Sequence, residues 1–160
     1  MKHKLLRKIT VILSTLAICT CLIGQSQVFA SDILKDSLAM ETDADYAEDT
    51  SYSLLRGNNL NFGTTQITKL SSTKINVSGL TQCHRVCDTV YLSMYLEQKS
   101  NGSYSTYKSW NFTADNVSNL SKSINVIVPS GHYYRVRGYH AAKDGAKEST
   151  ETLTSGVLVN

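Results

Sequence analysis

Two cysteines, Cys83 and Cys87 in the stretch QCHRVCD, are the residues whose type and spacing most directly suggest chemistry. In an oxidising compartment such a pair typically forms a disulfide, and closing this small loop is worth roughly 2 kcal/mol. We therefore expect a Cys83–Cys87 disulfide. Free thiols, a redox pair and a metal site that adds His84 and His132 or His140 remain alternatives. Zinc sites, however, usually show CxxC spacing with a second pair elsewhere.

A second candidate is the stretch GHYYRVRGYH, residues 131–140, in which large polar side chains alternate with smaller ones. Successive side chains of a strand point to opposite faces, so Tyr134, Val136 and Gly138 would face a core. Tyrosine and arginine are enriched at recognition surfaces. The candidate ligand-binding residues on the outer face of this strand and its expected neighbours are Tyr91, Tyr95, Trp110, Arg135, Arg137 and Tyr139. A purely structural role remains open, because cross-strand pairs of these types also stabilise sheets.

The sequence contains none of the common catalytic signatures. It has no G-x-S-x-G, no His-Glu-x-x-His and no phosphate-binding glycine loop. A triad could be assembled on paper from the histidines and aspartates, as in almost any chain of this size. We therefore expect a non-enzymatic protein that needs no cofactor and no metal.

The first thirty residues carry a targeting signal. A basic start, MKHKLLRK, precedes the apolar run ITVILSTLAICTCLIG, and Val28-Phe29-Ala30 ends the segment with small residues at the two cleavage positions. This pattern is typical of a secretory signal peptide, cleaved after Ala30, and the apolar run is short for a membrane anchor. We expect a secreted, extracellular protein with no stable membrane insertion after cleavage.

Charge is distributed unevenly along the chain. Four of the sixteen basic residues lie in the expected signal peptide, so the rest of the chain carries twelve against thirteen acidic residues. This near-neutral balance argues against nucleic acid as a partner. Residues 31–57 are acidic and weakly patterned, which predicts a largely disordered leader. The expected division is thus a signal peptide at 1–30, a leader at 31–57 and a folded domain at 58–160.

The composition of the expected folded domain is typical of β-strands. Runs rich in Thr, Val, Ile and Tyr recur between short Gly, Asn and Ser segments. We predict strands at 64–70, 74–80, 89–98, 104–113, 123–128, 133–141 and 151–159. Asn101-Gly102 predicts a tight hairpin between the third and fourth of these.

Alternation along the strands indicates a core. Val90, Leu92, Met94 and Leu96 would share one buried face, and Leu80 would join the core after an irregularity at Gly79. Seven strands in about 100 residues is the size of an antiparallel immunoglobulin-like β-sandwich.

The segment VIVPSGHYYRVRGYHAAKDGAKEST, about a quarter of the chain, resembles the last two strands of a fibronectin type III domain. The resemblance rests on a proline before a glycine turn and on a tyrosine that opens an alternating strand. Tyr133 and Tyr134 both fit that tyrosine position, and the tryptophan that many such domains carry in their second strand is absent. The resemblance implies a fibronectin type III or immunoglobulin-like fold and almost nothing about function.

Nearly the whole chain beyond the signal resembles a family of small secreted proteins from clostridia and related Gram-positive bacteria, a domain of unknown function. The resemblance rests on the acidic leader, on CHRVCDTVYLSMYLEQKSNGSYSTYKSW and on YYRVRGYH. It implies an extracellular bacterial protein with no assigned activity. Together these observations predict a binding or adhesion module for a cell-wall glycan, a host glycan or a protein. A self-assembling structural protein is the main alternative, and a small secreted enzyme is a third.

Overall fold

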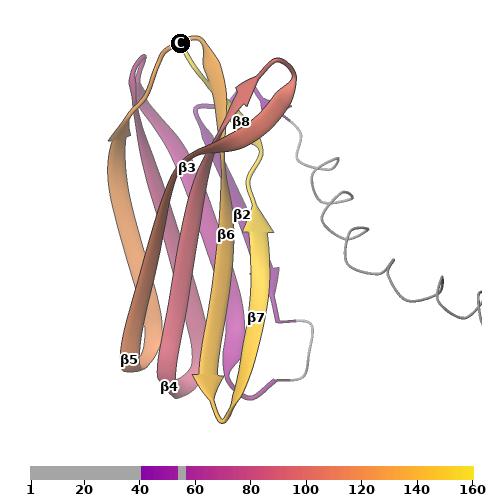
Figure 1. Cartoon of the computed structure of the whole chain (residues 1–160), viewed down its shortest axis with the longest axis vertical. Coiled ribbons are helices and arrows are strands. Elements are labelled where there is room, and N and C mark those ends of the chain that lie inside the picture. Colours follow the sequence, from indigo (N-terminus) through magenta and orange to yellow (C-terminus); the bar gives the residue numbers. More distant parts are fainter. Residues whose placement is uncertain (1–40, 54–56) are drawn as a thin grey trace, which may run out of the picture. The chain divides into compact units, whose positions relative to one another are not determined.

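The computed structural model describes residues 41–53 and 57–160, in which every regular element is a β-strand (Figure 1). The expected signal peptide and the first part of the expected leader lie outside the described residues. The strands are β1 (Glu41–Thr42), β2 (Tyr46–Tyr52), β3 (Leu60–Ser71), β4 (Lys74–Ser100), β5 (Ser103–Ile127), β6 (His132–Asp144), β7 (Ala146–Leu153) and β8 (Gly156–Val159).

These strands form a single mixed sheet that is nearly closed into a barrel-like shape (Figure 1). The order is β1-β8-β6-β4-β3-β2, with β5 paired to β4 and β7 paired to β6. β1 pairs parallel with β8, and the other described pairs are antiparallel. Side chains bridge β2 and β7: the Leu153 N–H donates to Asp49 Oδ2 at 2.8 Å, and the Ser51 and Thr150 hydroxyls are 2.7 Å apart.

This architecture confirms the all-β class but is not a clear immunoglobulin sandwich of two separate sheets. The strands expected at 74–80 and 89–98 are two halves of β4, and those expected at 104–113 and 123–128 are two halves of β5. β4 pairs with β3 through its first half and with β6 through its second half. Because β4 and β5 bend instead of ending, backbone pairing continues from one side of the fold to the other.

The bend in β4 lies at one end of the fold, where its pairing with β5 shifts register between Gln82 and Cys87. The Gln82 side chain bridges the two strands there by donating to the backbone oxygens of Cys83 and Ser118, at 2.8 and 3.1 Å. The Glu148 carboxylate of β7 ties down the start of β3 by accepting three backbone N–H groups at 2.8–3.1 Å, those of Asn58, Asn59 and Leu60. The bend is thus linked to β5 through Gln82 and to the segment before β3 through the His84 N–H, which donates to the Asn59 carbonyl at 2.9 Å.

Part of the acidic segment belongs to the sheet. We expected residues 31–57 to form a largely disordered leader, but Glu41–Thr42 and Tyr46–Tyr52 form β1 and β2. β2 pairs with β3 over its whole length, and the Ala47 side chain packs into the core. Of the two acidic residues in this strand, Glu48 is exposed, whereas the Asp49 carboxylate accepts the Leu153 N–H of β7.

The expected hairpin at Asn101-Gly102 is confirmed. Both residues have positive φ, 51° and 82°, and Ser100 pairs with Ser103 across the turn. Asparagine and glycine are the residues that tolerate this left-handed conformation best.

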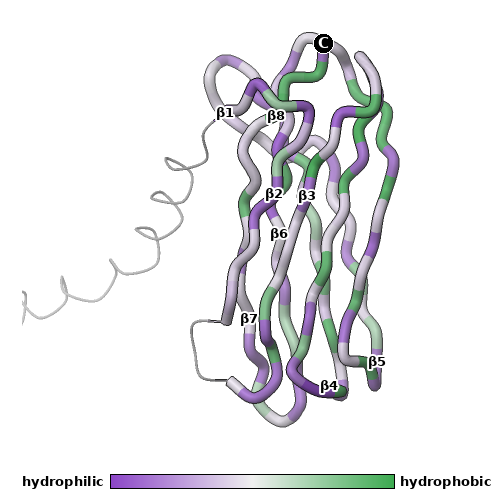
Figure 2. Tube along the Cα trace, turned by 180° about the vertical axis from the view of Figure 1, so that it is seen from behind, coloured by the Kyte–Doolittle hydropathy of each residue, from purple (hydrophilic) through white to green (hydrophobic). Residues whose placement is uncertain are grey.

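The core follows the alternation of the strands, visible as alternating colours along the chain in Figure 2. Val90, Leu92, Met94 and Leu96 are all fully buried, as expected. Leu80 is not a core residue, because β4 continues regularly through Gly79. Gly79 and Thr81 face the interior, with Met94 and Leu92 directly against Gly79, whereas Leu80 points outward.

A polar cluster lies inside this apolar core. His140 of β6 is fully buried between Thr81 of β4 and Thr152 of β7, each hydroxyl 3.0 Å from one ring nitrogen. Thr65 of β3 donates to Thr152 at 2.8 Å, and Thr81 donates to the Tyr91 carbonyl at 2.9 Å. The Thr81 hydroxyl gives its one proton to the Tyr91 carbonyl, so it must accept from the ring, and Nδ1 carries the ring proton. The Thr152 hydroxyl accepts from Thr65, so its own proton is donated to Nε2. Four strands are thus joined by one chain of hydrogen bonds.

We predict that Thr152→Val destabilises the protein by roughly 1–3 kcal/mol, because it leaves Thr65 and His140 buried without their shared partner. Thr152→Ser keeps the hydroxyl and should cost less than the valine variant, although it removes a larger part of the side chain's apolar contact. Urea unfolding of both variants measures the difference. Equal losses, or a larger loss for serine, would show that packing and not hydrogen bonding governs this position.

Candidate functional site

The second half of β4, together with β6 and β7, presents a surface rich in tyrosine. Tyr91, Tyr95 and Ser93 of β4 lie opposite Ala141, Arg137 and Tyr139 of β6, and directly opposed residues share a face. All of these except Ala141 are partly exposed. We call this surface the tyrosine face and define it by Tyr91, Tyr95, Arg137, Tyr139 and Lys147. It brings together four of the six residues expected to bind a ligand.

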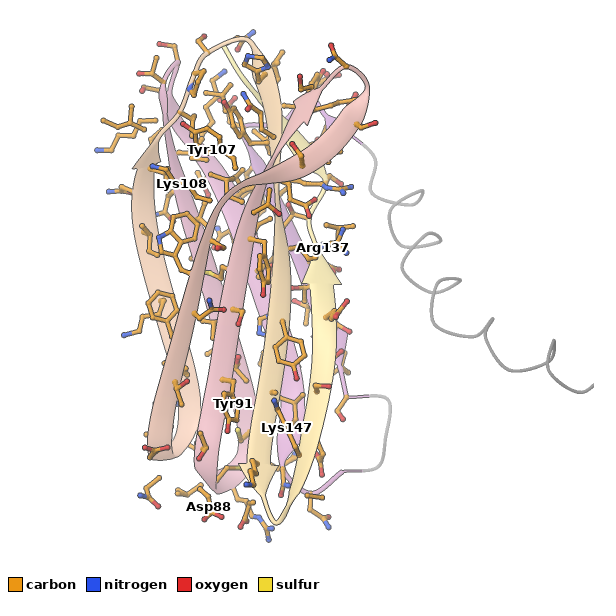
Figure 3. All side chains as sticks on the ribbon, viewed as in Figure 1. Asp88, Tyr91, Tyr107, Lys108, Arg137 and Lys147 are labelled. Atoms are coloured by element: carbon orange, nitrogen blue, oxygen red, sulfur yellow. The ribbon has the colours of Figure 1, made fainter. Side chains whose placement is uncertain are left out.

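Lys147 of β7 is the residue of this face that sequence reasoning missed. Its ammonium lies 4.5 Å from the centre of the Tyr91 ring and 5.4 Å from that of Tyr139, so it sits over both rings (Figure 3). The pair Asp144-Gly145 forms the turn between β6 and β7, with φ of 75° at the glycine, and places Lys147 opposite Lys143. Asp-Gly is a hairpin signal, so the sequence could have indicated this strand and its lysine.

Arg135 was expected on the exposed outer face, and this expectation is wrong in one respect. Arg135 does point to the outer side, but only 2% of it is exposed. Its Nε donates to Glu97 Oε2 at 2.6 Å, and its guanidinium carbon lies 4.0 Å from the centre of the Tyr104 ring. Glu97 accepts from Arg137 Nε through its other oxygen, at 3.0 Å. A cationic side chain buried in this way needs such a partner and cannot contact a ligand directly.

Tyr104 covers this ion pair because the tip of the β4–β5 hairpin curls toward β8 (Figure 1). The Tyr104 hydroxyl would lie 2.0 Å from a Cβ at position 156, so a larger residue there would displace the Tyr104 side chain. This hydroxyl is buried and has no hydrogen-bond partner among the described residues. Burial, and then the charge of Glu41, raise the pKa of Tyr104 to about 12. Glu41 itself forms an ion pair with Lys99, which joins β1 to the same hairpin.

Trp110 does not belong to the tyrosine face. It lies opposite Met94 and packs against the core, with part of its surface exposed. The reason is a β-bulge: Leu96 pairs with Lys108 and Glu97 with Thr106, which leaves Tyr107 as an extra residue. One extra residue moves all following side chains to the opposite face. Without it, Trp110 would oppose Ser93 and point outward.

The side chains of Cys83 and Cys87 are both buried at the bend of β4. The desolvation caused by burial, and then a hydrogen bond with Cys87, raise the pKa of the Cys83 thiol to about 12. The two thiols are therefore neighbours, and the expected disulfide between them stays a prediction. Nearby, Arg85 and Asp144 form an ion pair at 2.8 Å, which links the bend to the turn between β6 and β7.

The histidines considered as metal ligands or catalytic bases lie apart. The His140 ring is held by threonine hydroxyls in the core, and His132 packs edge-on against Tyr134. His84 is exposed at the bend. Among residues 41–53 and 57–160, no group of three or more His, Cys, Asp or Glu side chains is arranged to hold a metal ion. The same residues include no helix long and apolar enough to cross a membrane.

The raised pKa of the Tyr104 hydroxyl predicts how the stability of the protein depends on pH. Its pKa is about 10 in an unfolded chain and about 12 in the fold, so the unfolded state loses the proton first as pH rises. The wild type should therefore lose stability between about pH 10 and 12. Tyr104→Phe should be about 1 kcal/mol more stable at pH 8, because it removes an unpaired buried hydroxyl, and its advantage should grow toward pH 12.

Urea unfolding at pH 8 and pH 11 measures both effects, with Tyr52→Phe as the matched control because its side chain is 65% exposed. An advantage that does not change with pH would contradict the assignment of the alkaline loss to Tyr104.

The raised pKa of Cys83 predicts how fast this thiol reacts with a labelling reagent. At pH 8 a thiol with a pKa of about 12 is ionised in about one molecule in ten thousand, and only the thiolate reacts readily. In the fully reduced protein, Cys83 should therefore react with iodoacetamide far more slowly in the folded than in the unfolded state. Peptide mass spectrometry reads the label at each cysteine. Equal labelling rates would show that the bend opens readily, and a requirement for reductant after unfolding would establish the disulfide.

Comparison with known proteins identifies the family. Residues 35–157 match a family described as "Family of unknown function (DUF6147)". None of the curated proteins matches the chain. Among solved structures, the sporulation control protein Spo0M of Bacillus subtilis is similar over 71% of this chain, with 10% identity and a TM-score of 0.36. The match spans half of the Spo0M chain. The chain belongs to the DUF6147 family of unknown function.

Proposed function

We propose that this protein is a secreted, non-enzymatic binding module that recognises its ligand through the tyrosine face. The observation that carries the proposal is the grouping of Tyr91, Tyr95 and Tyr139 with Lys147 and Arg137 on one exposed surface. Tyrosine rings offer a large contact area at low conformational cost, and their hydroxyls add hydrogen bonds. A cell-wall glycan, a host glycan or a protein is the proposed class of ligand.

The rigidity of this surface supports the proposal. The tyrosine side chains stand on β4 and β6, which pair over ten consecutive residue pairs in the centre of the sheet. Lys147 lies over two of the rings in the absence of a ligand. Binding would therefore cost less side-chain conformational entropy than it would for a freely rotating lysine. A surface prepared in this way suits recognition better than a mobile loop.

The finer fold assignment, an immunoglobulin-like or fibronectin type III-like relationship, is part of the same proposal. Tyr134 is fully buried, and its hydroxyl donates to the Pro129 carbonyl five residues upstream, at 2.9 Å. This contact resembles the tyrosine corner of immunoglobulin-like domains. Tyr134, rather than Tyr133, would then be the corner residue. Domains of this kind commonly present ligand-binding surfaces outside the cell, in agreement with the secretory signal expected at residues 1–30.

The proposal predicts that a variant carrying Tyr139→Ala and Lys147→Ala loses binding to its ligand by about ten-fold or more, as expected when residues central to an interface are truncated. The measurement is a pull-down of purified protein on peptidoglycan, followed by a glycan array and a screen of secreted proteins. Tyr52→Ala, an exposed tyrosine on β2, is the matched control.

Circular dichroism and thermal unfolding confirm that each variant is folded. If the variant and the control bind equally well, the tyrosine face is not the site. If the folded wild type binds nothing in any of the three assays, the tyrosines are structural and the proposal fails.

A further inference from the structure

β5 has a long edge without a backbone partner among the described residues. It pairs with β4 from Ser103 to Ile127, and no other described strand pairs with it. An edge of this kind exposes unpaired N–H and C=O groups and can accept another strand. On the opposite side of the fold, β2 and β7 are bridged by side chains from Asp49 and Ser51. The outer strands β2 and β7 are thus joined to each other, whereas β5 pairs only with β4 among the described residues.

The first half of this edge also exposes aromatic surface. Trp110 and Phe112 are consecutive on the core side of β5, and each is only partly buried. Their backbone lies in an outer strand of the sheet, and no further described strand pairs with it. Charge is sparse here, with Lys108 and Asp115 as the ionised side chains of residues 108–115. Lys122, from the second half of β5, lies over the Phe112 ring at 5.4 Å and shields part of it.

We propose that two copies of this chain pair antiparallel through residues 108–114 of β5, about a two-fold axis at Asn111. In an antiparallel pair, opposed residues must share a face, and this register satisfies that condition. Trp110 then opposes Phe112 of the second copy, twice by symmetry, while Ser109 opposes Thr113 and Lys108 opposes Ala114. Asn111 opposes its own copy, which is a self-complementary amide contact. No like charges face each other, and two aromatic pairs form, which favours a second copy over an unrelated strand.

The symmetry of this dimer has a consequence for binding. The axis is perpendicular to the sheet, so the outer faces of both copies point in the same direction. Asn111 and the tyrosine face lie on the same side of the sheet, because Asn111 opposes Ser93. The dimer would therefore carry two tyrosine faces on one continuous surface, and a polymeric ligand could occupy both with increased avidity. This last step rests on the proposed function, whereas the dimer does not.

Cysteine cross-linking tests the register directly. In the proposed dimer the two Asn111 Cα atoms are about 4.5–5.5 Å apart, within the range of a disulfide. Thr113→Cys places its two cysteines four residues out of register, about 13 Å apart. With oxidised glutathione as the oxidant, Asn111→Cys should give about ten-fold more disulfide-linked dimer than Thr113→Cys. Ser109→Cys and Thr113→Cys should cross-link to each other only when mixed.

Peptide mass spectrometry assigns each linkage, so the native cysteines do not confuse the result. Analytical ultracentrifugation of the purified protein should show a dimer that Asn111→Lys, an exposed substitution placing two like charges on the axis, converts to a monomer. A monomer at all concentrations, or equal cross-linking of the two cysteine variants, would overturn the proposal. Neither readout requires a ligand, so the dimer can fail while ligand binding stands, and the reverse.

Discussion

The structure depends on the continuity of β4 through its bend. A strand that stopped at the bend would leave two sheets held together by side chains alone. Instead β4 shifts register between Gln82 and Cys87 and continues, so its first half serves β3 and its second half serves β6. Hydrogen bonds from Gln82 and Glu148 hold this end of the fold. The single barrel-like sheet, the buried thiols and the placement of the tyrosine face all follow from that bend.

The outer surface of the sheet has two parts, one covered by other side chains and one accessible. Near the hairpin tip, the Tyr104 ring packs on the Arg135 guanidinium, and the ion pair of Arg135 with Glu97 is buried although it lies on the outer side of the sheet. Toward the other end nothing described covers the strands, and the tyrosines are accessible. The same alternation of side chains thus gives two parts of the outer surface: a buried ion pair near the hairpin tip and a candidate binding surface at the other end. The difference lies in the curl of one hairpin and not in the residue types.

Much of the fold could be predicted from local patterns, because alternation and turn residues locate strands and the Asn101-Gly102 hairpin. The site was predicted less completely. The face to which Trp110 points depends on the β-bulge at Tyr107, and no sequence pattern indicates that bulge. The burial of Arg135 depended on Tyr104, thirty-one positions earlier in the chain. The continuity of β4 was hidden because the exposed polar residues around His84 look like a loop.

The long β4–β5 hairpin also bears on how the chain folds. Its pairs begin beside the turn at Asn101-Gly102 and extend outward to Lys74 and Ile127. Each new pair is adjacent to one already formed, so the loop that must close at each step stays small, and zipping from a turn avoids most of the entropy cost of distant contacts. The hairpin is thus a template: once it has formed and bent, β3 and β6 have edges on which to assemble. We therefore expect folding to begin in the same two strands that form the geometric centre of the sheet.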